Sequence, residues 1–173
     1  MNEVLKCLET RRSVRAYKPE QITDAELEAI LNAGLYAPTG MNRQSAIMLV
    51  IQDKPLIEKL SKMNAYYMGK DMDAFYGAPT VIAVLADSNI RTHFEDGCLV
   101  LGNLMNAAHS LGVDSCWIHR AREVFDDPEG RAILRECGIG DEYVGIGHCI
   151  LGYGVSPAGD ASPRRENRVY TIK

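Results

Sequence analysis

Apolar residues along the chain form two kinds of pattern, and the first is the short continuous run. Residues 46–51 and 80–86 are apolar runs of strand length, which is typical of buried strands. A shorter run at residues 116–118 and a glycine-broken run at residues 144–151 are further strand candidates. These runs predict a sheet with a buried interior.

The second pattern is helical periodicity. Residues 3–10, 55–63 and 128–137 are predicted helices, and the last begins with proline, which suits a first helical turn. Thr23 and Glu26 are spaced as a capping box ahead of another helix, whose apolar residues fall on one face. That helix should end before Pro38, because the residue preceding a proline is pushed out of the helical region.

One further helix, beginning near Phe94, is apolar around most of its circumference. The residues that set its spacing are Phe94, Cys98, Leu101, Met105 and Ala108, and Gly112 stands where a C-cap glycine would. Such a helix needs burial on more than one side. We therefore expect it to run through the centre of the domain or to lie under a second subunit.

The end of the chain carries Gly, Pro and Arg but no helical periodicity. We expect residues 153–173 to be an extended arm of the domain formed by residues 1–152, and such an arm usually needs a surface to lie on. Strand and helix candidates alternate irregularly and without repeats. The pattern predicts an α+β domain whose sheet is covered by helices, with the arm reaching across a dimer partner.

Composition narrows the function classes. A chain of 173 residues suits one domain, and its net charge of −4, with no basic tail, argues against nucleic-acid binding. Residues 1–7 lack the apolar core of a signal peptide, and no stretch approaches the roughly 20 apolar residues of a membrane span, so we expect a cytoplasmic protein. The five cysteines have irregular spacing and no Cys-x-x-Cys pair, which favours reduced thiols.

Several common chemical signatures are missing from the sequence. It contains no Gly-x-Gly-x-x-Gly, no phosphate-binding P-loop and no Gly-x-Ser-x-Gly elbow. Its four histidines are scattered, without the spacing of a metal-binding pair, and we interpret most of them as structural or surface residues. We predict no metal site and name no catalytic side chain.

The main indication of a ligand is an arginine cluster just after the first helix, formed by Arg11, Arg12, Ser13 and Arg15. Guanidinium groups offer planar paired donors that match phosphate oxygens, and the serine hydroxyl adds another donor. The cluster therefore suits a small phosphorylated ligand. The alternative is structural, because arginines after a helix also stabilise its last carbonyl groups and the negative end of its dipole.

Two other segments carry related chemistry. The turn after the second helix contains Pro38, Thr39, Asn42 and Gln44, whose polar side chains can bond to the edge of a planar heterocycle. The arm supplies a second arginine pair, Arg164 and Arg165.

Together these pieces resemble the FMN-dependent nitroreductase family. The resemblance runs over almost the whole chain, through Arg-Arg-Ser-x-Arg, Ala-Pro-Thr-Gly-x-Asn-x-Gln, the apolar helix after Asp96-Gly97, the passage at residues 111–118, and Leu-Gly-Tyr at 151–153. It implies a layered α+β dimer with a central, mostly antiparallel sheet and two identical FMN sites at the subunit interface. Two departures are Ser45-Ala46, where many members have Pro-Trp, and His119, where members often have a small residue.

The resemblance also implies the role of each residue. Arg11, Arg12 and Ser13 would hold the FMN phosphate, with Arg164 and Arg165 returning to it, and Arg15 would lie at the pyrimidine edge of the flavin. Pro38, Thr39, Asn42 and Gln44 would come from the other subunit.

The implied activity is hydride transfer from NAD(P)H through FMN to a nitroaromatic, quinone or similar acceptor, in ping-pong order. A cation at Arg15 would stabilise the reduced flavin. The alternatives are an FMN-binding sensor or carrier without turnover, and a flavin-free structural protein whose arginines cap a helix.

Overall fold

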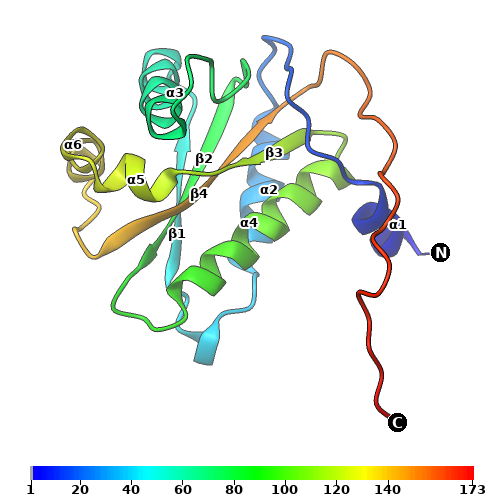
Figure 1. Ribbon diagram of the computed structural model, residues 1–173. Coiled ribbons are helices and arrows are strands. Elements are labelled where there is room, and N and C mark those ends of the chain that lie inside the picture. The colour runs from blue at the N-terminus through cyan, green and yellow to red at the C-terminus, as the bar shows by residue number, and fades with distance from the viewer. Residues whose placement is uncertain (1) are drawn as a thin grey trace.

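A computed structural model describes residues 2–173 of the chain (Figure 1). The elements in chain order are α1 (Glu3–Thr10), α2 (Asp24–Leu35), the 3₁₀ turn η1 (Gly40–Asn42), β1 (Ala46–Ile51), α3 (Lys54–Met68), β2 (Thr80–Asp87), α4 (His93–Ser110), β3 (Asp114–Ile118), α5 (Ala121–Asp126), α6 (Pro128–Glu136) and β4 (Tyr143–Gly152). The expected α+β class is confirmed.

The strands form one sheet in the order β1-β2-β4-β3, and each neighbouring pair is antiparallel. Helices α2 and α4 pack on one face, with α1 beyond them against α4, and α3, α5 and α6 pack on the other (Figure 1). Alternate residues of β2 enter the two cores: Val84 faces α2 and α4, while Ala83 faces α3 and α5. This two-sided burial explains why β2 is a continuous apolar run.

Three expectations for single elements need correction. The run at residues 46–51 was expected to be buried, but β1 is an edge strand, and only Ile51 is fully buried. Helix α3 extends beyond the expected 55–63, because its buried face continues through Asn64 and Ala65 until Gly69 ends it in the left-handed conformation (φ 64°). Helix α5 was not expected, since six residues are too few to show a helical period.

The glycines predicted to break the last strand do not end it. β4 runs from Tyr143 to Gly152, and its register with β2 shifts between Val84 and Leu85, opposite Gly147 and Gly145. A side chain at Gly145 would collide with the carbonyl oxygen of Ala121. The glycine therefore lets α5 approach the sheet closely.

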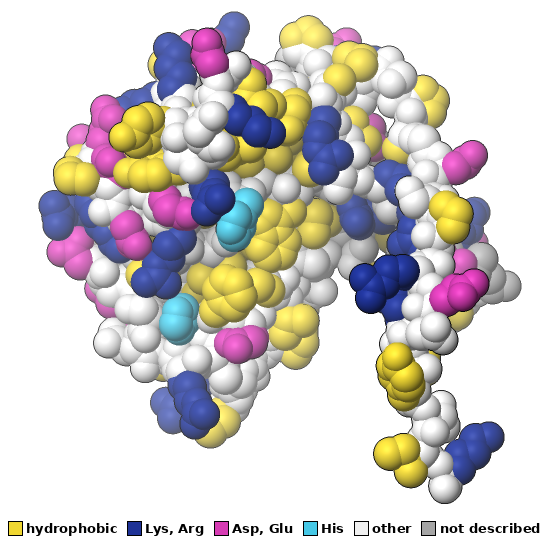
Figure 2. Space-filling view, viewed as in Figure 1, with side chains coloured by type: hydrophobic (Ala, Val, Ile, Leu, Met, Phe, Trp, Pro, Cys, Tyr) yellow, Lys and Arg dark blue, Asp and Glu magenta, His cyan; other side chains and the backbone are white. Residues whose placement is uncertain are grey.

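Helix α4 lies against the sheet and also against α2, with one side left open. Val100, Leu101, Leu104 and Ala108 are buried, whereas Leu99 is 46% exposed. Figure 2 shows hydrophobic side chains gathered on this face of the molecule, beside Lys, Arg and His. The expectation of burial on more than one side is confirmed within the chain.

The arm leaves the domain after β4. From residue 157 onward it contains no helix or strand, and Val169, Tyr170 and Ile172 are exposed. Figure 1 shows it running away from the sheet, past α1, to the C-terminus. Within residues 2–173, no helix combines the length and the apolar character that crossing a membrane requires.

His148 is a histidine buried in the core between two aromatic rings. Its ring centroid lies 5.1 Å from that of Phe75 and 5.7 Å from that of Phe125. It is fully buried, and neither ring nitrogen has a hydrogen-bond partner among residues 2–173. Burial lowers the pKa of His148 from its ordinary 6.5 to about 3, and the nearby backbone of Ile118 offsets only part of this shift.

This buried imidazole predicts a specific acid sensitivity. Between pH 6.5 and about 3 the unfolded chain binds a proton that the folded chain excludes, so stability present above pH 6.5 is lost as the pH falls. In His148→Leu this component should vanish, which flattens the dependence of the unfolding free energy on pH by up to about 1.4 kcal/mol per pH unit. Urea unfolding at several pH values measures it. An unchanged slope in His148→Leu would contradict the assignment.

Candidate functional site

The segment that carries the arginine cluster is pinned along the edge strand β3. The backbone N–H of Val14 donates to the carbonyl of Ser115 (3.1 Å), and that of Lys18 donates to the carbonyl of Tyr153 (2.8 Å). The side chains of Val14 and Tyr17 are buried, and the Tyr17 hydroxyl donates to the Val14 carbonyl (2.8 Å). Ser13 and Arg15, on either side of Val14, remain exposed on a fixed backbone.

Arg11 and Arg12 combine the structural role with unused donors. The N–H of Arg11 donates to the Cys7 carbonyl at the end of α1 (3.0 Å), and Nη1 of Arg12 donates to the Glu9 carbonyl (2.8 Å). The capping alternative therefore describes part of what these residues do. Nη1 of Arg11, Nε of Arg12 and Oγ of Ser115 are nevertheless buried without a partner in the described chain.

Arg15 lies at the wall of a separate pocket of about 330 Å³. The other lining residues are Met68, Ala74, Tyr76, Trp117, Ile118, His119 and Arg120. The volume is at the lower end of the range for small-molecule sites. Tyr76 (φ 56°) and Arg120 (φ 78°) both have left-handed backbone conformations, and such strain in non-glycine residues clusters at functional sites.

The charges around this pocket are unequal. Nη1 of Arg120 lies 2.6 Å from Oε1 of Glu123. Burial, the largest single effect, would raise the pKa of Glu123, but the hydrogen bond from Arg120, a backbone hydrogen bond and the nearby charges of Arg120 and His119 together hold that pKa below its ordinary value. The positive charge of Arg120 is therefore balanced by Glu123. Arg15, in contrast, forms no ion pair within residues 2–173. Arg15 is the cation that the pocket can offer to a ligand.

The turn of residues 38–44 is also strained. Met41 (φ 51°), Asn42 (φ 54°) and Gln44 (φ 49°) all have positive φ. The Thr39 hydroxyl accepts a hydrogen bond from the N–H of Gln44 (3.2 Å), and the Gln44 amide donates to Oδ1 of Asn42 (3.3 Å). Pro38, Asn42 and Gln44 are exposed and Thr39 is half-buried. Their polar groups are thus held together on the surface.

The turn and the arginine cluster lie at opposite ends of α4. The turn contacts Asp96 near the start of that helix, while α1 contacts its end through the bond from the Cys7 thiol to the Asn106 carbonyl (3.2 Å). Asp96 and Asn106 are ten residues apart, which is about 15 Å along a helix axis. Figure 1 shows α1 beside one end of α4 and the loop of residues 38–45 at its other end.

The arginine pair of the arm lies apart from both groups. Arg164 and Arg165 are exposed, and the guanidinium of Arg164 donates to the carbonyl of Ser162 on the arm itself (3.0 Å). Their expected return to a phosphate therefore stays a prediction.

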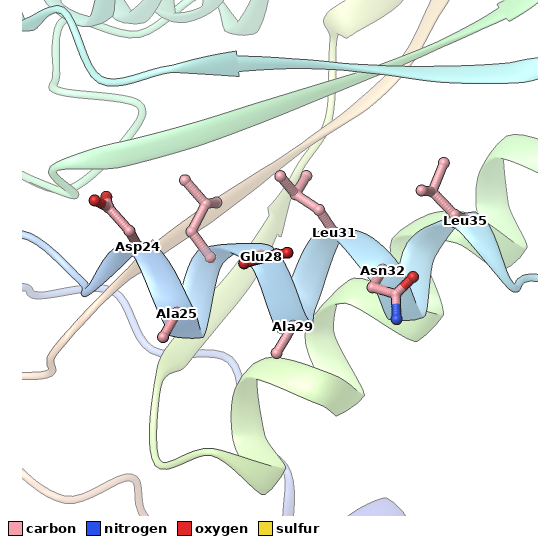
Figure 3. Close-up of a pocket in the computed structure, with 8 residues that line it drawn as sticks. Asp24, Ala25, Glu28, Ala29, Leu31, Asn32 and Leu35 are labelled. Atoms are coloured by element: carbon pink, nitrogen blue, oxygen red, sulfur yellow. The ribbon is translucent and has the colours of Figure 1, made fainter.

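Two other hollows lack the chemistry of the predicted site. A shallow depression of about 760 Å³ follows α2, where Asp24, Leu31 and Leu35 point to one side (Figure 3). A second hollow of about 740 Å³ lies between α3 and residues 71–79, and there Asp73 is already bonded to the Ser61 hydroxyl (2.6 Å) and to backbone N–H groups. Neither is lined by a residue of the arginine cluster or the turn.

Sequence reasoning missed two contributors, Ser115 and Asp96. Both belong to segments of the quoted resemblance, but no spacing rule connects Ser115 with Ser13, or Asp96 with Gly40. Strand pairing and helix packing bring these residues together.

Comparisons with known proteins agree with this geometry. The family model described as the nitroreductase family matches residues 8–68 and 64–153. A protein of Archaeoglobus fulgidus, assigned by name as an NADH dehydrogenase/NAD(P)H nitroreductase, is 32% identical over 88% of this chain and 86% of its own length.

Solved structures give the same result. The crystal structure of a nitroreductase with bound FMN from Bacteroides fragilis superposes with a TM-score of 0.91 at 29% identity over 100% of both chains. A nitroreductase with bound FMN from Desulfitobacterium hafniense gives 0.88 at 26% identity, over 99% of this chain and 100% of its own. The chain therefore belongs to the nitroreductase family.

Proposed function

We propose that the protein is a homodimeric FMN-dependent oxidoreductase that passes hydride from NAD(P)H to a nitroaromatic, quinone or similar acceptor. The observation that carries the proposal is the arrangement of residues 11–15. Buried, unpartnered donors of Arg11 and Arg12 lie at one end of a fixed segment, and Arg15 lies at the other end in a pocket. The FMN bound by the Bacteroides fragilis and Desulfitobacterium hafniense relatives supports this reading.

The donor set fits FMN in two respects. Guanidinium nitrogens that are buried without a partner cost free energy unless an acceptor reaches them, and a phosphate supplies several acceptor oxygens. The pocket at Arg15 has flat or apolar walls from Trp117, Tyr76 and Ile118, which suit a planar ring.

Each group of residues then has a distinct task. Arg11, Arg12 and Ser13 would hold the phosphate, and Arg15 would place a positive charge beside the ring. When bound, FMN supplies the relay of hydride between NAD(P)H and the acceptor, and exchange of the two substrates at one site would make the kinetics ping-pong. The protein side chains would orient the flavin and stabilise its charge, and none of them is needed to move a proton.

A second copy of the chain would complete the site. The turn with Thr39, Asn42 and Gln44 contacts α4 about 15 Å along the helix axis from the point where α1, which precedes the arginines, contacts it. An antiparallel partner helix would bring the other subunit's turn toward them. The open side of α4 supports such packing, since a side chain at Gly102 would meet no atom within 4 Å and Leu99 is exposed. The arm, with Arg164 and Arg165, would lie on that partner.

The first prediction concerns the phosphate. The wild type should bind FMN in preference to riboflavin. NADH or NADPH should bleach the bound flavin in the absence of oxygen, whereas the flavin of a protein that only carries FMN without turnover would stay yellow. Arg11→Ala should weaken FMN binding about tenfold or more, because a charge-assisted hydrogen bond is worth about 1.5–3 kcal/mol. Arg135→Ala, which removes an exposed arginine on α6, is the control. Equal affinity of the wild type for FMN and riboflavin would refute the phosphate role.

The second prediction concerns Arg15. If its charge is felt mainly by the reduced flavin, Arg15→Ala should lower the two-electron midpoint potential by about 30–60 mV, and Arg15→Lys should recover part of it. Redox titration of FMN-saturated variants measures this. Arg11→Ala should keep the wild-type potential, and a shift in Arg11→Ala but not in Arg15→Ala would reverse the two roles.

The third prediction tests the shared site. Asn42→Ala and Arg11→Ala should each bind FMN weakly as homodimers. A heterodimer of the two, purified through different affinity tags, has one site with an intact arginine cluster and an intact turn. It should bind one FMN per dimer with the wild-type affinity. A heterodimer that binds as weakly as its parents would mean that each site takes its turn and its arginines from the same subunit, which would refute the shared site.

A further inference from the structure

Asp96 is a buried carboxylate that joins both ends of the strained turn to the start of α4. It is 2% exposed. Its Oδ1 accepts a hydrogen bond from the backbone N–H of Gly40 (2.9 Å), and its Oδ2 accepts one from the hydroxyl of Ser45 (2.7 Å). The Thr92 hydroxyl donates to the same Oδ2 (3.2 Å).

The charge of this carboxylate has no cationic partner within residues 2–173. Neutral donors and the N-terminal turn of α4 stabilise it instead. Burying a carboxylate is unfavourable unless its hydrogen bonds are well made, so each donor contributes to keeping it in place. The side chain is consequently fixed, and so are the groups bonded to it.

The two bonds from the turn enclose the strained residues. Met41, Asn42 and Gln44, with positive φ, lie between Gly40 and Ser45. Such conformations persist only where the surroundings hold them. Gly40 fits because a side chain there would overlap Thr92, another partner of Asp96.

We propose that Asp96 is the positioning residue for the turn that contacts the flavin of the partner subunit. It acts by bonding Gly40 and Ser45, which sets the direction in which Thr39, Asn42 and Gln44 present their polar groups. This inference rests on the proposed function, because it gives the turn a ligand to contact. The hydrogen bond from the Ser45 hydroxyl to Asp96 is a particular feature of this chain. Many members of the family resemblance have proline at this position, and proline has no side-chain donor.

The test compares variants of Asp96 and of its partner Ser45 with a variant of another helix-capping carboxylate, Asp127. Asp96→Ala removes all three bonds, Asp96→Asn keeps an oxygen for Gly40, and Ser45→Ala removes one donor. Asp127→Asn is the control, because Asp127 also caps a helix, accepting from the N–H of Glu129 (2.8 Å) and the hydroxyl of Tyr67 (2.8 Å) on the other side of the sheet. FMN affinity, the visible circular dichroism of bound flavin at saturation, and urea unfolding without FMN are measured for each.

We expect FMN affinity to fall about tenfold or more in Asp96→Ala, less in Asp96→Asn and severalfold in Ser45→Ala. The visible circular dichroism should change in the same order. Asp127→Asn should lose stability yet keep the wild-type affinity and spectrum. This separates positioning from a merely structural role.

Folded Asp96→Asn and Ser45→Ala with wild-type affinity and spectrum would overturn the role of Asp96 while leaving the proposed function intact. Where the Asp96 variants do not fold, Ser45→Ala alone decides, and wild-type values there overturn the proposal. A wild-type protein that takes up no FMN would instead refute the proposed function, and the positioning role with it.

Discussion

The two-sided burial of α4 is the constraint on which the rest of this structure depends. The helix packs its Leu101 and Leu104 side against the sheet and α2, and its two ends hold the segments that carry the candidate site. Asp96 near its start fixes the turn, and Asn106 near its end receives α1 and, through it, the arginine cluster. Because the helix is rigid, the distance between these segments is fixed by its length rather than by the loops.

Much of the fold could be predicted from the sequence because local patterns and tertiary structure agree. The Thr23–Glu26 capping box forms as expected, with the Thr23 N–H donating to Glu26 (2.8 Å). β2 could be recognised from its apolar run because both of its faces are buried. The partial burial of β1 could not be predicted, because an edge strand and a central strand can have the same composition. The order of strands in a sheet depends on long-range pairing.

The candidate site could be predicted only in part. Side-chain chemistry singled out Arg11, Arg15 and Asn42, because guanidinium and amide groups have recognisable preferences for phosphate and heterocycle edges. It did not separate Arg15 from Arg11, which differ in where β3 places them: one lies in a pocket with Trp117, the other at the end of α1. Asp96 gave no signal, since a carboxylate in the first turn of a helix is common and its partners in the turn, Gly40 and Ser45, are more than fifty residues away in the chain.

The exposed edge of β1 has a consequence for how the protein reaches its folded state. The strand reads Ala-Ile-Met-Leu-Val-Ile, pairs with β2 on one side only, and contains no charge or proline of the kind that discourages edge-to-edge association. Short apolar strands without such residues are prone to aggregate while they are uncovered. Recovery of soluble protein on refolding should therefore depend on the concentration at which denaturant is removed, a kinetic competition that the stability of the finished fold does not govern.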